Sequence, residues 1–220
     1  MATIEKSNKV KIHTRYELAN GERVPSVTTV LSILNKPALL DWAWRLGTEG
    51  IDYKAVRDTA ADVGSLAHYL ILCHLKGIEP DLSEYSQQVI DHAETCLIKF
   101  WDWEKEHTLK PVLIETPLVS EAYHFGGTPD WFGTIDATEE ILDFKTGKAI
   151  YAEFFYQLAG YNQLLQEASH VSKRARILRI GRDENEGFEE RVVAGLAKQW
   201  AVFLNCLNIY NLQKEIKKGG

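Results

Sequence analysis

The chain has 220 residues, of which 45% are hydrophobic and 25% charged, and its formal net charge is −6. This length can bury one sizeable core, so we expect a single domain over residues 1–220, with residues 1–60 as an N-terminal hairpin and helical elaboration. The negative charge argues against a protein that coats nucleic acid nonspecifically, because such proteins neutralise many phosphates with lysine and arginine.

The sequence indicates neither a membrane segment nor a cysteine-based site. No apolar run approaches the roughly 20 residues that cross a bilayer, and the first residues lack a secretory apolar core, so we expect a cytoplasmic protein without membrane contact. Cys73, Cys96 and Cys206 are widely separated and form no Cys-x-x-Cys pair. They are expected to be reduced, buried thiols, and their number excludes a self-contained four-cysteine iron–sulfur cluster.

The first half of the chain is predicted to be a hairpin followed by helices. Asn20-Gly21 is a turn signal between a strand over residues 9–18 and a short return strand over 22–24. Capping residues and helical spacing then predict four helices. The first runs from Ser26 to about Leu34, the second begins at Pro37 and ends before Asp52, the third runs from Asp52 to about Leu75, and the fourth from Ser86 to about His107.

The second half changes to strand-like segments. Residues 111–120, 123–135 and 140–146 are predicted as a three-strand meander, followed by a helix over 151–167, a strand over 174–181 and a helix over 196–216. The order helix, three strands, helix, strand predicts an α/β fold with a mixed sheet.

The segment EILDFKTGK carries the first candidate site. Asp143 and Lys145 are two residues apart on a predicted strand, so their side chains share one face while Leu142 and Phe144 point to the other. An ordinary surface salt bridge is the simpler explanation of an Asp-x-Lys pair. A charge pair inside an apolar strand would be costly without a function, however, and this favours a site.

Asp130, in the preceding predicted strand, is expected to lie beside Asp143. Two converging carboxylates repel each other unless a cation lies between them, and oxygen ligands favour Mg²⁺ or Mn²⁺. The metal would polarise a phosphoryl oxygen while Lys145 orients the attacking water or takes its proton. This is the chemistry of phosphodiester hydrolysis.

Four sequence blocks in this order resemble the RecB-type nucleases of the PD-(D/E)xK superfamily, whose fold is restriction-endonuclease-like. Thr128-Pro129-Asp130, twelve intervening residues and Asp143-Phe144-Lys145 match the family's central signature. Gly64-Ser65-Leu66-Ala67-His68 resembles its Gly-x-x-x-His helix, and Gln157-Leu158-Ala159-Gly160-Tyr161 resembles its Gln-x-x-x-Tyr motif. Ile71 departs from the pattern, because some members carry an acid there.

The resemblance implies roles for these residues. Asp130, Asp143, His68 and the backbone carbonyl of Phe144 would bind the metal, and Lys145 would act on the water. Substrate-binding roles would fall to Gln157, Tyr161 and Thr146. A lone histidine on an apolar helix is more often a packing residue, and only the Gly-x-x-x-His context favours His68 as a ligand.

Secondary candidates carry equally plausible structural interpretations. Glu115 either extends the carboxylate cluster as a secondary metal ligand or is a surface acid of an edge strand. Arg174 and Arg176 either contact DNA phosphates or line a solvated strand face.

The segment from Pro25 to Trp42 is similar to the opening of phage exonucleases of this group and of the mitochondrial genome maintenance exonuclease. In those enzymes such additions enclose the strand, which implies an exonuclease that acts on single-stranded or frayed DNA. The aromatic and basic residues suited to an unpaired strand are Trp42, Trp44, Arg45, Lys54 and Arg57.

The expected function is metal-dependent exonucleolytic hydrolysis of DNA in phage or bacterial recombination, repair or end processing. A structure-specific endonuclease and a noncatalytic nucleic-acid-binding module of the same fold are the alternatives. A recombination or single-strand-binding protein is the kind of partner such an enzyme has, and the sequence identifies none.

Overall fold

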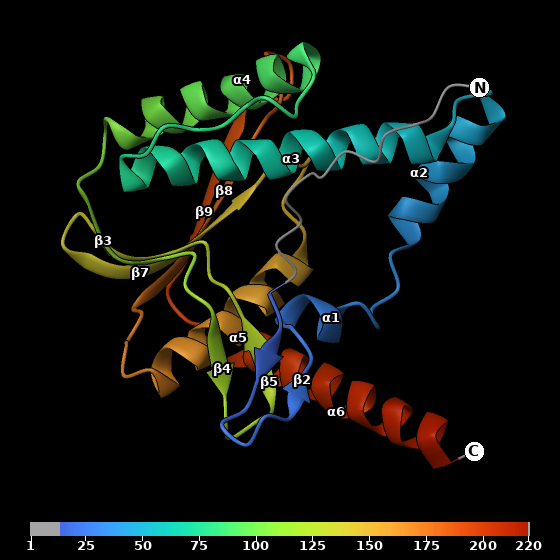
Figure 1. The fold of residues 1–220 in the computed structure, drawn as a ribbon, viewed down its shortest axis with the longest axis vertical. Coiled ribbons are helices and arrows are strands. Elements are labelled where there is room, and N and C mark those ends of the chain that lie inside the picture. The colour runs from blue at the N-terminus through green and yellow to red at the C-terminus, as the bar shows by residue number, and fades with distance from the viewer. Residues whose placement is uncertain (1–13, 220) are drawn as a thin grey trace.

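A computed structural model describes residues 14–219 as a mixed α/β fold (Figure 1). Its helices are α1 (Val27–Leu31), α2 (Pro37–Thr48), α3 (Tyr53–Lys76), α4 (Gln87–Glu104), α5 (Ala152–Glu167) and α6 (Ala197–Gly219). Its strands are β1 (Tyr16–Glu17), β2 (Arg23–Val24), β3 (Leu109–Ile114), β4 (Leu118–Ser120), β5 (Phe125–Gly127), β6 (Trp131–Ile135), β7 (Thr138–Lys145), β8 (Arg174–Ile180) and β9 (Phe188–Val193).

The predicted helix starts are confirmed, two of them by capping hydrogen bonds, whereas Ser86 caps α4 without a side-chain hydrogen bond. The Ser26 side chain accepts a hydrogen bond from the backbone N–H of Thr29, and Asp52 accepts one from that of Lys54. Pro37 occupies the first position of α2, where its missing N–H costs nothing. The hairpin of β1 and β2 is also present, although residues 9–13 of its predicted first strand lie outside the described part of the chain.

The main sheet has five strands in the order β3-β6-β7-β8-β9. Strands β7 and β8 run parallel and the other neighbours are antiparallel, so the sheet is mixed, as predicted. Helix α5 makes the crossover between the two parallel strands, which cannot be joined by a tight turn. The C-terminal end of β7, where Lys145 lies, is therefore central in the sheet and close to the start of α5.

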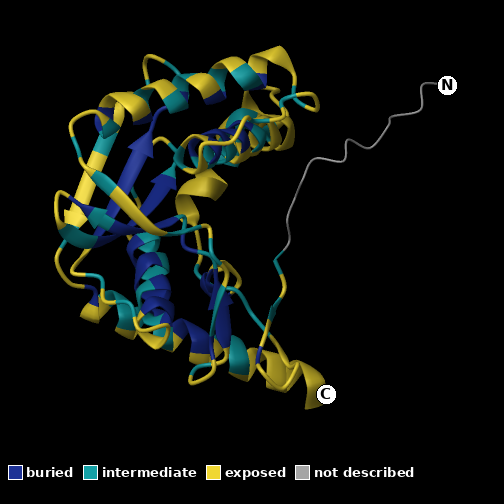
Figure 2. Ribbon diagram, turned by 60° about the vertical axis from the view of Figure 1, so that its left-hand side comes forward, coloured by how far each residue is buried: buried dark blue, intermediate teal, exposed yellow. Residues whose placement is uncertain are grey.

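Helices cover both faces of this sheet (Figures 1 and 2). Helices α3 and α4 pack on one face, against Leu142 and Phe144 of β7, and α1, α5 and α6 pack on the other, against Ile141. Figure 2 shows the central strands buried between helices whose outer faces are exposed. None of the helices in the described residues has the length and apolar character needed to span a membrane.

Two segments that were each predicted as one strand are divided in two, and both divisions lie beside Asp130. The predicted strand over 111–120 divides into β3 and β4, because Glu115 adopts a left-handed backbone conformation with φ 46°. The predicted strand over 123–135 divides into β5 and β6 around Pro129, which has no N–H to donate. The Glu115 N–H donates to the carbonyl oxygen of Asp130 at 3.0 Å, so the two breaks face each other.

Strand β9 was not predicted, and it completes a buried charge network with β8. Arg176 donates two hydrogen bonds to the fully buried carboxylate of Glu140, at 2.8 and 3.1 Å, and also contacts Glu190 of β9. Arg174 is more distant, at 3.6 Å from the same Glu140 carboxylate. The network compensates the charge of Glu140, which would otherwise be costly inside the sheet.

We therefore predict that Arg176→Met lowers the free energy of unfolding by about 3–5 kcal/mol, because it leaves the Glu140 charge buried without its main partner. Urea unfolding at neutral pH measures the change. The matched control is Lys173→Met, whose partner Glu139 is exposed, and this change should cost less than about 1 kcal/mol. Equal losses for the two variants would contradict the structural role of Arg176.

Candidate active site

The two acids and the lysine of the predicted signature meet at the C-terminal end of β7. Asp143 and Lys145 form an ion pair, and only 1% of the Asp143 side chain is exposed. Asp130 lies just before β6 instead of inside a strand, and its Oδ2 accepts a hydrogen bond from the backbone N–H of Phe144 at 2.8 Å. The side chain of Asp130 is thereby fixed to the backbone between Asp143 and Lys145.

Helix α3 adds His68 to this group from the opposite face of the sheet. The His68 Nδ1 lies 3.7 Å from Oδ2 of Asp130. One turn earlier, a Cβ added to Gly64 would lie only 2.7 Å from Oγ1 of Thr146. Because Gly64 has no side chain, α3 can approach the end of β7 closely. This explains why a glycine lies one helical turn before His68.

Burial sets the protonation of these groups. Burial, with a smaller contribution from the charge of Asp130, raises the pKa of Asp143 to about 6 against the opposing charge of Lys145. Burial also raises the pKa of Asp130. Removal from bulk water, followed by the charge of Lys145, lowers the pKa of His68 to about 4. At neutral pH Asp143 is therefore ionised and His68 is a neutral imidazole.

Helix α5 contributes the polar pair Gln157 and Tyr161. The side-chain amide of Gln157 donates to the Tyr161 hydroxyl at 2.9 Å. Burial and the charges of Asp143 and Asp130 raise the pKa of Tyr161 well above its ordinary value, so the hydroxyl stays protonated and can donate toward the acids. Both residues reach the same end of the sheet as the acids.

Phe154 is a site residue that the sequence interpretation missed. The Lys145 Nζ lies 5.1 Å from the centroid of its ring, within the range of a cation–π contact. The helical spacing could have indicated it, because Phe154 lies three residues before Gln157 on α5 and so shares a face with it.

The secondary candidates separate into two groups. Glu115 is exposed and is joined to Asp130 through its backbone N–H, and burial followed by the charge of Asp130 raises the pKa of its carboxyl. Arg174 and Arg176 pair with Glu140 and Leu142, before the end of β7 where Lys145 lies, and both contact the Glu140 carboxylate. The sequence could not indicate this contact, since the carboxylate partner lies on a different strand, and the predicted contact of the two arginines with phosphates stays a prediction.

The donor chemistry of the site fits a small divalent cation. Oδ1 of Asp143 is buried and, among the described residues, has no hydrogen-bond partner. Across residues 14–219, no three histidine, cysteine or acidic side chains are gathered closely enough to hold a metal ion by themselves. Mg²⁺ is commonly held by one or two carboxylates together with water and substrate phosphates, so Asp130 and Asp143 suffice as its protein ligands.

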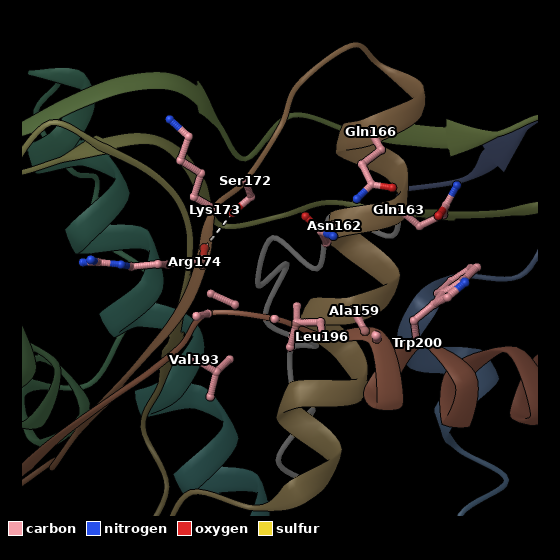
Figure 3. A pocket seen from close by; sticks show the side chains of 14 residues that line it. Ala159, Asn162, Gln163, Gln166, Ser172, Lys173, Arg174, Val193, Leu196 and Trp200 are labelled. Carbon is pink, nitrogen blue, oxygen red and sulfur yellow. Dashed lines mark hydrogen bonds between the residues drawn. The ribbon is translucent and has the colours of Figure 1, made fainter.

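Two cavities lie along α5. One, of about 650 Å³, reaches Phe154 and Gln157 and so adjoins the acids. The other, of about 300 Å³, is lined from α5 by Asn162 and from the start of α6 by Trp200 (Figure 3). In Figure 3 the basic side chains of Lys173 and Arg174 both extend away from the second cavity, and no acid is among the described residues that line it, so no charges converge there.

Comparisons with known proteins support the fold. No family model and no curated protein sequence matches the chain. The chain is similar to a candidate exonuclease from Eubacterium rectale, with 12% identity and a TM-score of 0.50 over 73% of this chain and 68% of the other. An alkaline exonuclease from Laribacter hongkongensis matches with 13% identity and a TM-score of 0.34, over 73% and 92% of the two chains. The first likeness shows a shared fold.

We predict that Asp143→Asn stabilises the metal-free protein at pH 7.5 by on the order of 2 kcal/mol. The pKa of Asp143 is raised from 3.8 to about 6, so the folded state binds this proton more tightly than the unfolded state. The stability of the parent should therefore rise as pH falls from about 6 to about 4, and the difference from the variant should vanish. In the variant, Lys145 still has the charge of Asp130 near it, because these two groups also interact in the parent.

Thermal melting in EDTA between pH 7.5 and pH 4 measures this difference. Asp41→Asn, an exposed aspartate on α2, is the matched control and should follow the parent at every pH. A destabilised Asp143→Asn at pH 7.5 would show that the ion pair with Lys145 outweighs the burial of the carboxylate.

Proposed function

We propose that the chain is an Mg²⁺- or Mn²⁺-dependent deoxyribonuclease that removes nucleotides from DNA ends. The observation that carries this proposal is the buried Asp143–Lys145 pair beside Asp130, with one Asp143 oxygen left without a hydrogen bond. A charge pair this costly is expected where it performs chemistry. The exonuclease description of the structurally similar protein from Eubacterium rectale agrees with this function.

The proposed metal ligands are Asp130 and Asp143, with His68 and the backbone carbonyl of Phe144 beside them. When bound, the ion would polarise a phosphoryl oxygen and lower the pKa of its bound water. The neutral imidazole of His68 is in the protonation state that ligation requires, because its pKa is about 4. The group that titrates near pH 6 is Asp143 instead, so its proton would compete with metal binding at acidic pH.

The protein side chains then have distinct roles in the reaction. Lys145, held between Asp143 and the ring of Phe154, orients the attacking water or the scissile phosphate. Gln157 and Tyr161 form a hydrogen-bonded pair that positions the DNA strand or braces the acids. Because each group already lies in place, little reorganisation is needed when the substrate binds.

The proposed biological setting is recombination, repair or end processing in a phage or bacterium, with single-stranded or frayed DNA as the substrate. The exposed aromatic side chain is Trp44 on α2, whereas Trp42 packs edge-on against Tyr53, and Lys54 on α3 adds a positive charge. The Arg57 guanidinium contacts Asp58 at 2.7 Å, so part of its charge is already compensated. Stacking on an exposed aromatic side chain suits unpaired bases.

We predict that linear single-stranded DNA is degraded in Mg²⁺ or Mn²⁺ and that a covalently closed circle of equal length is degraded at least about 100-fold more slowly. An enzyme that needs a free end cannot begin on a circle. The measurement is nucleotide release from the two substrates under the same conditions. EDTA and, separately, Asp143→Asn should each reduce release from the linear strand by at least about 100-fold.

The controls separate the possible failures. Asp41→Asn should keep the activity of the parent, because Asp41 is exposed on α2. Equal rates on circle and linear strand would replace the exonuclease by an endonuclease with the same acids. Full release in EDTA, or by Asp143→Asn, would reject the metal mechanism.

A further inference from the structure

The cavity of about 650 Å³ lies where α5 faces the connection between the first two helices. It is lined by the end of α1, by residues 32–36, by the first turn of α2 and by the start of α5. In Figure 1, α1 lies beside α5 and α6, whereas α2 lies at the end of α3 on the other side of the sheet. Residues 32–36 therefore connect the two helical layers, and the cavity lies along this connection.

One wall of this cavity is shared with the candidate active site. Phe154 lines the cavity, and its ring also lies under the Lys145 ammonium, with 5.1 Å between Nζ and the ring centroid. Gln157 likewise lines the cavity and is hydrogen-bonded to Tyr161 beside the acids. A ligand in the cavity would thus be continuous with a phosphate held at Lys145.

The lining is suited to a flat, mostly apolar group. Leucine and phenylalanine side chains form its walls, and Ser32, Asn35 and Gln157 supply hydrogen-bonding groups. Its cation, Lys36, forms an ion pair with Glu153, with 2.7 Å between Nζ and Oε1. Because this charge is already compensated within the lining, the cavity favours a nucleobase over a phosphate.

Helix α2 continues this apolar surface away from the cavity. All residues of α2 are described and none is buried. Leu40 and Trp44 are 65% and 70% exposed and lie one helical turn apart, so their side chains share a face. Leu40 also lines the cavity, which makes the exposed stripe and the cavity one surface.

We propose that this cavity binds an unpaired nucleobase of the strand whose backbone lies at Lys145, and that Leu40 and Trp44 contact the next base. The proposal rests on the proposed nuclease function and adds the element that selects a single strand. A base that remains paired and stacked in a duplex cannot turn into the cavity, so the strand must be unpaired there.

The test measures binding of two fluorescently labelled strands to the full chain by anisotropy, one an oligothymidylate and the other an abasic strand with the same number of phosphates. Ca²⁺ replaces Mg²⁺, and a gel checks that the strands stay intact. The parent should bind the oligothymidylate at least about tenfold more tightly than the abasic strand, as expected when one or two bases are held. Leu40→Ala should remove most of this difference by weakening only the oligothymidylate.

The matched control is Leu212→Ala, which removes a leucine that is 57% exposed on α6 and should leave both affinities unchanged. Equal binding of the two strands by the parent would overturn the base site and leave the nuclease proposal intact. An equal loss for both strands in Leu40→Ala would also overturn it, because the contact would then be to the backbone. If the parent binds neither strand, the proposed function itself fails.

Discussion

Asp143 and Lys145 form an ion pair at the end of the central strand of the sheet, and the free-energy cost of keeping two charges away from water constrains the residues around them. Only 1% of the Asp143 side chain and 17% of the Lys145 side chain are exposed. Burial raises the pKa of Asp143, and the charge of Lys145 only partly offsets this rise. A sheet built for stability would carry apolar residues at these positions, so the pair indicates chemistry.

Irregular backbone beside this pair leaves room for further polar side chains. Two strands break beside each other, at Glu115 and at Pro129, and this leaves Asp130 outside the regular ladder with its carboxylate on the Phe144 N–H. The missing side chain of Gly64 lets α3 approach from one face, while α5 brings Tyr161 from the other. The site thus gathers residues from both helical layers at one end of β7.

Local signals predicted most of the fold. Caps such as Ser26 and Asp52 fix where helices begin, because they act on N–H groups two or three residues away. The alternation in residues 140–146 predicted which side chains share a face. Strand β9 was missed because its sequence, FEERVV, is polar and its residues are mostly exposed, so it carries little of the hydrophobic pattern of a strand.

The parts of the site that the sequence could not supply depend on contacts between distant residues. The left-handed conformation of Glu115 has no local signature, and it determines where β3 ends. Arginine is a residue type that often binds phosphate, and the sequence around Arg176 does not show that its partner is Glu140, 36 positions away on another strand. The sequence motif therefore located the acids and the lysine, whereas their burial, and hence their pKa values, required the fold.

Calorimetric titration of the metal-free protein with Mn²⁺ at pH 7.5 tests the central claim most directly, because it needs neither substrate nor turnover. The account predicts saturable binding by the parent, with affinity that falls as pH decreases through about 6, where Asp143 takes up its proton. Asp130→Asn and Asp143→Asn should each abolish that binding while remaining folded. Unchanged Mn²⁺ affinity in both variants would contradict the assignment of these carboxylates as the metal site.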